Sequence, residues 1–387
     1  MIATIRPGIA CGSVAAPPSK SFAHRLLIAA ALKGVRCQVR NVSFPDDILR
    51  TLDCLEALGY HFEKGDETVL FSGVRSTPEG EIVMPCGDSG STLRFMIPLA
   101  LAKGGRFRFT GSERLISRGI DGYRQLFRDQ DILCETGPDS IIVEGKLKPG
   151  ELHVDVSQSS QYLTGVMLAL TSMLGRSKIV AEGKMESRSY IDITMAALKM
   201  AGPSLQAGRT LTVEGDWSNA AFLEAFNFIG GGVEVIGLNP DSVQGDRRCL
   251  EYFKALKEGF ANIDISEQID LGPVLFAVAA LLHGGKFTGT RRLALKESDR
   301  ASAMMQELSK FGVRGKVEEN SVTIEESALH APDGPLEGHN DHRVVMALCL
   351  PLSVYGGSIK EAEAVRKSYP EWFEVLRKLG IETTVEQ

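Results

Sequence analysis

Glycines recur in a sixfold pattern that constrains the fold more than any other feature of this sequence. Each of six apolar, helix-like runs ends at a glycine, and a short run in which β-branched or aromatic residues alternate with polar ones follows it, as is typical of a strand. These glycines are Gly34, Gly105, Gly175, Gly232, Gly285 and Gly357. Glycines end many helices, so one or two coincidences would mean little, but six in register indicate an internal repeat.

A second, amphipathic helical pattern follows each strand-like run. Five of the six end at a glycine, which relieves left-handed strain beyond a helix C-terminus. These five are Gly59, Gly202, Gly259, Gly312 and Gly380. The second unit ends near residues 127–131 without a glycine. In the long units two more strand-like runs precede the next apolar helix, so the unit is βαβαββ-like and about 60–70 residues long.

Six such units predict an α/β (α+β) protein with two lobes of three repeats each. We expect one lobe to cover residues 19–213 and the other residues 214–387. The third and fourth units are short, as if part of a hairpin were missing; after Gly259 the chain runs almost directly into the next helix motif. A length of 387 residues is consistent with two to three domains.

Composition and charge exclude several classes of protein. The net charge of −6 argues against a dedicated nucleic-acid binder, although it leaves room for a small basic pocket. Seven scattered cysteines without a CxxC pair are typical of free thiols in a reducing cytosol. The apolar stretch Val274–Leu282 is far shorter than the roughly 20 residues of a membrane span. The N-terminus does not resemble a signal peptide, and we expect a cytoplasmic protein.

The residues that precede the apolar helices indicate an anion site. Small hydroxylated residues, Gly, Asp and Asn dominate there, as helix N-caps require. Three of the six starts also carry basic residues in the first turns: Lys20 with Arg25, Arg94, and Arg343. Helix N-termini offer unpaired N–H groups and partial positive charge, so starts brought together by internal symmetry would bind phosphates and carboxylates.

Two further basic runs and one lysine are candidates for the same site. The runs are GSERLISRG (111–119) and ALKESDRASAMMQEL (294–308), and the lysine is Lys367. Each feature alone is more commonly a solvated surface group, and only the combination is informative. No GxxxxGK[ST] loop is present and no GxGxxG opens a helix, so nucleotide binding is unsupported. The histidines lack spaced partners, so we expect no metal site.

In their order along the chain, these motifs resemble the 5-enolpyruvylshikimate-3-phosphate synthase family nearly from end to end. The matching segments are PPSKSFAHRLLIAAAL, GDSGSTLRF, GSERLISRG, SSQYLTGVMLAL, SRSYIDIT, VEGDWSNAAF, KESDRASAM, NDHRVVMAL and RKSYPEWF. The resemblance implies the two-lobed enolpyruvyl-transferase fold, with residues 1–18 crossing into the C-terminal lobe. It also implies no metal and no organic cofactor.

The resemblance implies a reaction and a set of site residues. The enolpyruvyl group of phosphoenolpyruvate would pass to the 5-hydroxyl of shikimate 3-phosphate through a tetrahedral intermediate, and phosphate would leave. Around shikimate 3-phosphate we expect Lys20, Ser21, Arg25, Ser159, Ser160, Gln161, Ser187, Tyr190, Asp270 and Lys296. Around phosphoenolpyruvate we expect Lys20, Gly90, Arg94, Arg118, Gln161, Arg300, Arg343 and Lys367. The expected catalytic residues are Asp270, which takes or orients the hydroxyl proton, Glu297, which donates a proton to the methylene carbon, and Lys20.

The sequence also departs from the family pattern. Asp88 stands where Asn is usual, Gly119 replaces a common Pro, and Ala294 replaces a common Arg. The chain is shorter than typical members, with the deficit near 203–213 and 259–268. Because the missing segments resemble hairpin strands rather than motifs, we expect activity to survive.

Two alternatives remain open at this point. One is the related enzyme that loads enolpyruvate onto UDP-N-acetylglucosamine, which usually carries a loop Cys that GSERLISRG lacks. The other is a non-catalytic binder of phosphorylated metabolites, which Asp88 and the missing strands would permit. For the preferred interpretation the partners are the two small substrates alone, with no nucleic acid and no membrane, and the protein is a monomer.

Overall fold

The computed structural model describes residues 1–74, 80–202 and 205–386, so residues 203–204 of the expected hairpin deficit lie outside the described residues. The chain forms two compact units. One comprises Pro18–Glu214, and the other comprises Met1–Pro17 together with Gly215–Gln387. Each unit has its own buried apolar core.

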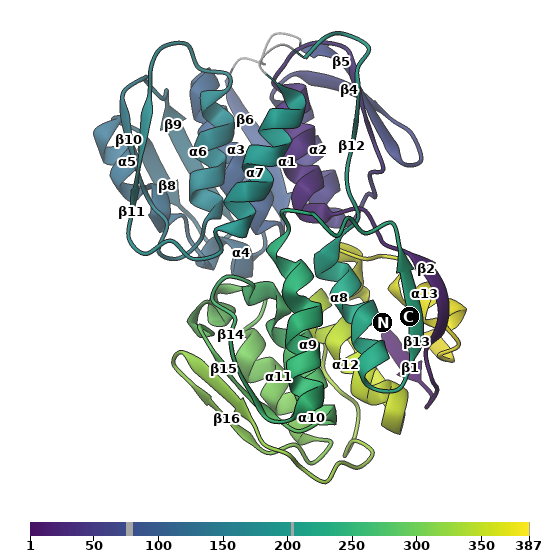
Figure 1. The fold of residues 1–387 in the computed structure, drawn as a ribbon. Helices are drawn as coiled ribbons and strands as arrows, with labels where there is room; N and C mark the ends of the chain where they lie inside the picture. The colour runs from purple at the N-terminus through teal and green to yellow at the C-terminus, as the bar shows by residue number, and fades with distance from the viewer. Residues whose placement is uncertain (75–79, 203–204, 387) are drawn as a thin grey trace. The chain divides into compact units, whose positions relative to one another are not determined.

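In the unit Pro18–Glu214, apolar helices alternate with strands and with more polar helices (Figure 1). Its helices are α1 (Lys20–Ala31), α2 (Asp46–Ala57), α3 (Gly90–Lys103), α4 (Glu113–Ser117), η1 (Asp121–Tyr123), α5 (Arg124–Asp129), α6 (Gln161–Leu170) and α7 (Ser189–Ala201). Its strands are β3 (Cys37–Arg40), β4 (Tyr60–Lys64), β5 (Thr68–Val74), β6 (Glu81–Gly87), β7 (Gly105–Gly111), β8 (Leu133–Thr136), β9 (Ser140–Gly145), β10 (Glu151–Asp155), β11 (Lys178–Glu182) and β12 (Thr210–Thr212).

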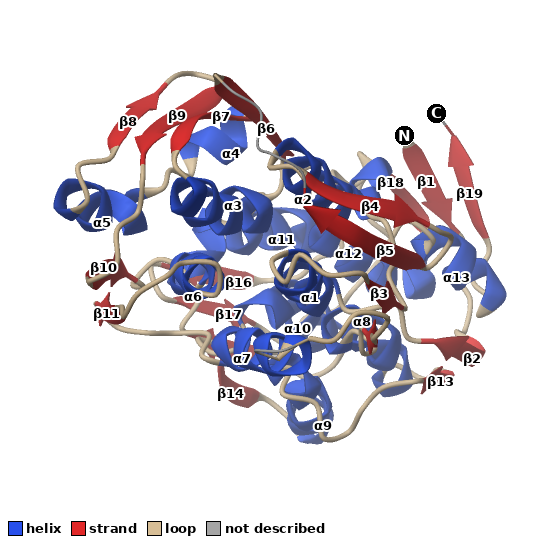
Figure 2. Cartoon of the chain, turned by 90° about the horizontal axis from the view of Figure 1, so that it is seen from above, coloured by secondary structure: helices blue, strands red, loops and turns tan. Residues whose placement is uncertain are grey.

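Three sheets in this unit reveal the repeat. Two have four strands, in the orders β12-β3-β5-β4 and β6-β7-β9-β8, and the third pairs only β10 with β11. In each sheet, the strand that follows an apolar helix has a parallel neighbour. β3, which follows α1, pairs with β12, whereas β7 and β11, which follow α3 and α6, pair with the preceding strands β6 and β10. The antiparallel hairpin completes the first two sheets, and among the described residues the third sheet has no such hairpin. Figure 2 shows α1, α3 and α6 lying inside these sheets.

The other unit repeats this plan with helices α8 (Trp217–Ala225), α10 (Gly272–Leu281) and α12 (His342–Tyr355) as its apolar members. Its remaining helices are η2 (Phe226–Phe228), η3 (Gly245–Arg248), α9 (Cys249–Glu258), η4 (Ile269–Leu271), η5 (Arg291–Leu295), α11 (Arg300–Ser309), η6 (Ala362–Lys367) and α13 (Trp372–Lys378). Its strands are β1 (Ile2–Ile5), β2 (Cys11–Ala15), β13 (Gly232–Ile236), β14 (Ala261–Asp264), β15 (Gly285–Thr288), β16 (Gly315–Glu318), β17 (Ser321–Ile324), β18 (Gly357–Lys360) and β19 (Thr383–Glu386).

Here too one repeat lacks its hairpin. The fifth repeat forms the complete sheet β14-β15-β17-β16, whereas the fourth has only β13 beside β2. In the sixth, β1 pairs antiparallel with both β18 and β19, and Leu336 bridges to Ile359 in parallel. The N-terminal strand therefore completes the last repeat. The fold is the α/β architecture with three βαβαββ repeats in each unit, and the third and fourth repeats are truncated.

The strands that precede α1 and α8 do not pair within their own repeats. β2 precedes α1 along the chain but pairs in parallel with β13. β12 precedes α8 but pairs in parallel with β3. Each unit therefore takes one strand from the chain segment that leads into the other unit's first helix.

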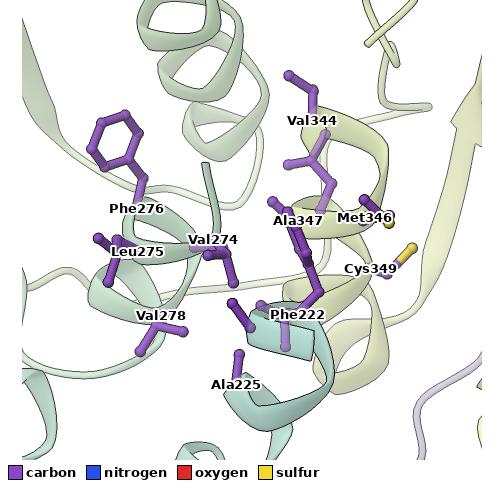
Figure 3. Close-up of a cluster of buried hydrophobic side chains, with 14 of the residues drawn as sticks. Phe222, Ala225, Val274, Leu275, Phe276, Val278, Val344, Met346, Ala347 and Cys349 are labelled. Carbon is purple, nitrogen blue, oxygen red and sulfur yellow. The ribbon is translucent and has the colours of Figure 1, made fainter. Parts of the chain in front are cut away.

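The apolar helices supply the cores because they are hydrophobic on all sides. Figure 3 shows side chains of α8, α10 and α12 packed together, among them Phe222, Leu275 and Met346. All three side chains are fully buried. No helix in the described part of the chain is both long and apolar enough to span a membrane.

The missing glycine of the second repeat has a structural replacement. Asp131 follows α5 with φ of 54°, the left-handed conformation that Gly59 adopts after α2 with φ of 87°. Asp and Asn tolerate this region better than most side chains, since they can hydrogen-bond locally. The chain turn is therefore the same, although the residue differs.

Candidate active site

The start of α1 brings two of the expected cations into a buried setting. Lys20 Nζ lies 2.8 Å from Asp47 Oδ2, and both side chains are mostly buried. Arg25, one turn later, is 2% exposed. It donates to Thr194 Oγ1 at 2.8 Å and to the carbonyl of Ser21 at 2.7 Å. Burial lowers the pKa of Arg25 to about 10, because its charge has lost water.

A second group of cations lies at the start of α3. A Cβ added to Gly90 would lie 2.8 Å from Arg94 Nη1 and 3.0 Å from Arg118 Nη2, so two guanidinium groups approach the bare glycine backbone. Arg94 donates to Gln161 Oε1 at 3.0 Å, and Gln161 Nε2 donates to Ser91 Oγ at 2.9 Å. The first residues of α3 and α6 and the end of α4 thus meet at one place.

The remaining expected residues of this unit lie at the starts of α6 and α7. Ser159 Oγ accepts from the backbone N–H of Gln161 at 3.2 Å, and Ser160 is the buried N-cap of α6. Ser187 is buried with φ of 58°, a conformation that costs free energy for a serine. The ring of Tyr190 lies 5.7 Å from the guanidinium of Arg25. We call Lys20, Arg25, Gly90, Arg94, Arg118 and Gln161 the cationic cluster.

In the other unit, Arg300 is the centre of a compact group of ion pairs. It is 1% exposed and donates to three carboxylates: Asp341 Oδ2 at 2.8 Å, Asp270 Oδ1 at 2.7 Å and Glu297 Oε2 at 2.6 Å. Burial opposes its charge, but the three carboxylates outweigh burial and raise the pKa of Arg300. A buried charge of this kind requires such partners.

Asp270 links Arg300 to the other expected residues. Lys296 Nζ lies 3.0 Å from Asp270 Oδ1, and Arg343 Nη1 donates to the backbone carbonyl of Asp270 at 3.0 Å. Burial lowers the pKa of Lys296 from its ordinary value, although Asp270 opposes the shift. Lys367 Nζ donates to the carbonyl of Asn340 at 2.7 Å, one residue before Asp341. We call Asp270, Lys296, Glu297, Arg300, Arg343 and Lys367 the ion-paired cluster.

Several residues of this machinery were not anticipated from the sequence. Asp341, the N-cap of α12, holds Arg300 and also accepts from the N–H of Arg343 at 3.0 Å. Asp47 and Thr194 hold Lys20 and Arg25. Asp341 lies inside the NDHR motif and Thr194 ends the SRSYIDIT motif, so both offered a signal, whereas Asp47 lies outside the quoted motifs and offered none.

The three departures from the family pattern occupy different environments. Asp88 is half-buried in the turn between β6 and α3, and Ala294 is exposed on η5. Gly119 has φ of 67°, and its carbonyl accepts from Arg94 Nη2 at 3.4 Å and from the Tyr162 hydroxyl at 3.3 Å. A proline ring fixes φ near −65°, so the proline common at this position could not adopt this backbone.

The two clusters can bind anions and move protons. Guanidinium and ammonium groups bind phosphate and carboxylate, and Asp270 and Glu297 are candidate proton carriers. Within the described ranges, no group of three or more His, Cys, Asp or Glu side chains could hold a metal ion.

Comparisons with known proteins agree along nearly the whole chain. The model of the family described as EPSP synthase (3-phosphoshikimate 1-carboxyvinyltransferase) matches residues 7–257 and 251–376. Curated relatives named 3-phosphoshikimate 1-carboxyvinyltransferase include one from Clostridium kluyveri, 35% identical over 97% of this chain and 97% of that protein. Another, from Clostridium novyi, is 33% identical over 95% of each.

Solved structures show the same fold. An EPSP synthase from Acinetobacter baumannii has a TM-score of 0.75 at 22% identity, covering 99% of this chain and 100% of that chain. The enolpyruvyl transferase NikO from Streptomyces tendae has a TM-score of 0.77 at 14% identity, covering 99% of this chain and 98% of that chain. These structures support the fold alone. The family model and the curated relatives show that the chain belongs to the EPSP synthase (3-phosphoshikimate 1-carboxyvinyltransferase) family.

Proposed function

We propose that this chain is an enzyme that transfers the enolpyruvyl group of phosphoenolpyruvate to the 5-hydroxyl of shikimate 3-phosphate. The observation that carries the proposal is the family match, which extends over both units and therefore over both clusters. The product leads to chorismate and the aromatic amino acids.

The cationic cluster is suited to the anionic groups of the substrates. We assign Lys20, Ser21, Arg25, Ser159, Ser160, Gln161, Ser187 and Tyr190 to shikimate 3-phosphate. We assign Gly90, Arg94 and Arg118, with Lys20 and Gln161, to phosphoenolpyruvate. The contacts that support these assignments are the two guanidinium groups at Gly90 and the pairing of Arg94 with Gln161. Because Gly90 has no side chain, a ligand can approach its backbone closely.

The ion-paired cluster supplies the acid–base groups and further cations. Asp270 takes or orients the 5-hydroxyl proton, and Lys296 stabilises its charge from 3.0 Å. Glu297 delivers a proton to the methylene carbon. Its 2.6 Å contact with Arg300 means that it must receive this proton during the catalytic cycle, since an ion pair favours the charged carboxylate. We also assign Arg300, Arg343 and Lys367 to phosphoenolpyruvate.

The reaction then balances in two steps. In the first, the 5-hydroxyl oxygen bonds to the central carbon of phosphoenolpyruvate, the hydroxyl loses its proton, and the methylene carbon gains one. In the second, the bond from the central carbon to the phosphate oxygen breaks, phosphate leaves, and the methyl group gives up a proton to restore the double bond. Each proton transfer requires a side chain within hydrogen-bond reach.

Phosphate release with defined substrate pairs tests this function. We expect release only when phosphoenolpyruvate and shikimate 3-phosphate are both present. Release with UDP-N-acetylglucosamine in place of shikimate 3-phosphate would assign the chain to the related sugar-nucleotide reaction. Binding of both substrates without release would identify a non-catalytic binder.

The proposal extends to partners and assembly. The two substrates are the small-molecule partners, no organic cofactor is required, and the protein acts as a monomer. Light scattering on a sizing column measures the assembly directly, and a mass of twice the chain's 41.9 kDa would contradict the monomer. Activity that survives dialysis against a chelator would support a reaction independent of metal.

A further inference from the structure

Asp246 is a buried carboxylate that no assignment above uses. It lies in η3 and is 5% exposed. Hydrogen bonds hold the loop that carries Asp246 against the start of α8. Gln244 Oε1 accepts from the N–H of Trp217 at 3.2 Å, Gln244 Nε2 donates to the carbonyl of Gly215 at 2.8 Å, and Trp217 Nε1 donates to the carbonyl of Asn239 at 2.8 Å. Asp246 is therefore held on a well-anchored segment.

The carboxylate of Asp246 reaches Arg343 through one hydroxyl. Arg343 Nη2 donates to Ser218 Oγ at 2.7 Å, and the Ser218 side chain also hydrogen-bonds to Asp246. Arginine has no acceptor atoms, so the proton of the Ser218 hydroxyl is directed to Asp246. The other arm of Arg343 donates to the carbonyl of Asp270 at 3.0 Å. Arg343 is thus held on one side by Asp270 and on the other by an oriented serine.

Charged groups from three other elements face this carboxylate. They are Arg343 on α12, Asp270 on η4 and Asp216 at the N-cap of α8. The charge of Asp246 also helps to raise the pKa of Cys249 and of Tyr252, both on α9. Burial raises the pKa of Asp246 to about 6, Asp270 and Asp216 add to the shift, and Arg343 opposes it. The group is mostly ionised at pH 7.5 and mostly protonated at pH 5.

We propose that Asp246 is a positioning residue for phosphoenolpyruvate: it orients the Ser218 hydroxyl, which in turn holds Arg343 in the orientation that receives the anionic substrate. This inference rests on the proposed function, in which Arg343 binds phosphoenolpyruvate. It differs from a purely structural role because the charge of Asp246 also lowers the positive potential at Arg343. By orienting Ser218, Asp246 therefore raises the affinity for phosphoenolpyruvate, whereas its negative charge lowers this affinity.

Three variants separate these two effects. Ser218→Ala breaks the connection to Arg343 but keeps the charge of Asp246, and it raises KM for phosphoenolpyruvate about five- to tenfold, as expected for loss of one hydrogen bond. Asp246→Ala breaks the same connection and also removes the charge, so it raises KM by a smaller factor. Turnover changes less than about twofold. If the two residues act in one chain of contacts, the double variant is no worse than either single variant. Asp246→Asn keeps an oxygen that accepts from Ser218 and removes the charge, so at pH 7.5 its KM for phosphoenolpyruvate falls below that of the parent enzyme.

The pH profile supplies a readout that a structural residue would not move. The ratio of parent KM to Asp246→Asn KM is near one at pH 5 and rises about two- to fivefold as the pH passes through 6, because only the parent carboxylate ionises there. Titration of the substrate's own phosphate affects both proteins equally and cancels in the ratio. Asp241→Asn is the matched control, since Asp241 is an exposed aspartate of the same loop.

The outcomes are distinguishable. An active parent enzyme whose KM is unchanged by Asp246→Ala and Ser218→Ala, or whose double variant is fully additive, overturns the inference alone. A ratio that stays constant from pH 5 to pH 8 also overturns it. A parent enzyme that releases no phosphate from its two substrates overturns the proposed function instead. Thermal unfolding of each variant identifies any that fails to fold, and Asp246→Asn, the most conservative change, then decides through the pH profile.

Discussion

The two clusters hold buried cations by different chemistry. In the cationic cluster, Arg25 and Arg94 contact hydroxyl, carbonyl and amide oxygens and lie over aromatic rings, with Arg25 4.9 Å from the ring centre of Phe95 and Arg94 5.2 Å from that of Tyr162. In the ion-paired cluster, Arg300 contacts three carboxylates. Among the described residues, the contacts of Arg25 and Arg94 include no carboxylate, so their positive charge can be neutralised by a bound anion, whereas the charge of Arg300 is already neutralised by its carboxylate partners. Under the proposed function, both clusters bind substrate, and the ion-paired cluster also contains the proposed proton carriers Asp270 and Glu297.

Replacement of Asp270 by Ala should have the largest effect, because it removes the proposed base from the ion-paired cluster. We expect turnover to fall about 10²- to 10⁴-fold, the usual contribution of a general base, and KM for either substrate to change much less. Steady-state kinetics measures both quantities. Asp241→Ala is the control for loss of an exposed aspartate in the same unit. A loss confined to KM would make Asp270 a positioning residue and would blur the distinction between the clusters.

Replacement of Arg118 by Ala should come next and should act on binding. A charge-assisted contact to the substrate is worth about 2–3 kcal/mol, so KM for phosphoenolpyruvate should rise roughly 30- to 150-fold. Arg128→Ala, at an exposed arginine of the same unit, should have no effect. Unchanged kinetics for phosphoenolpyruvate in Arg118→Ala would remove Arg118 from the site.

Gly90→Ala tests the same cluster and should have a smaller effect on KM than Arg118→Ala. The new Cβ would lie within 3.0 Å of two guanidinium ends, which must move aside. Because these are the ends of flexible side chains, we expect a roughly tenfold rise in KM for phosphoenolpyruvate with little loss of stability. Gly137→Ala is the control, because its Cβ would meet its nearest neighbour at an ordinary 3.6 Å. An unchanged KM would show that ligand does not approach the backbone here.

Two histidines should respond to acid in opposite ways, and His24, which is buried in the unit Pro18–Glu214, gives the larger effect. Burial, with Lys20 and Arg25 nearby, holds the pKa of His24 well below 6.5. In acid, the unfolded chain therefore binds a proton at His24 that the folded chain does not bind. The free energy of unfolding falls as the pH drops below 6.5, with a limiting slope of about 1.4 kcal/mol per pH unit. His24→Asn should remove this slope. Hydrogen exchange of α1 between pH 5 and pH 7 measures it, and an unchanged slope would contradict the prediction.

His339 of the other unit should show the opposite sign and the smallest effect. Its contact with Glu307, 3.1 Å from Nε2 to Oε1, raises the pKa of His339 above 6.5. Burial opposes the charge of Glu307, but hydrogen bonds outweigh it and leave the pKa of Glu307 below 4.5. The pair therefore stabilises fully between about pH 4.5 and 6.5, and its contribution declines as the pH rises through the folded pKa of His339. His339→Gln should flatten the decline in hydrogen-exchange protection of α12; a steeper decline would contradict this.

Much of the fold could be predicted because the repeat leaves local signals. Every glycine-ended apolar run is a helix, and every alternating run after it is a strand, since helix C-caps and strand alternation depend on neighbouring residues. The family resemblance placed Lys296, Glu297 and Arg300 in one site, and the spacing of Lys296 and Arg300 already indicated a shared helix face. In the structure Lys296 instead precedes α11, and the two residues meet through Asp270.

What the sequence by itself determined is the set of parts: six apolar helices, their strands, and the basic residues at the starts of three of these helices. Only the tertiary structure decided how these parts are joined. The pairing of β2 with β13 and of β12 with β3 connects strands far apart along the chain, and hydrogen bonds between strands leave no local pattern in sequence. The partners of the buried charges, Asp47 for Lys20 and Asp341 for Arg300, were decided in the same way. A buried cation requires an oxygen nearby, but which residue supplies it depends on the path of the whole chain.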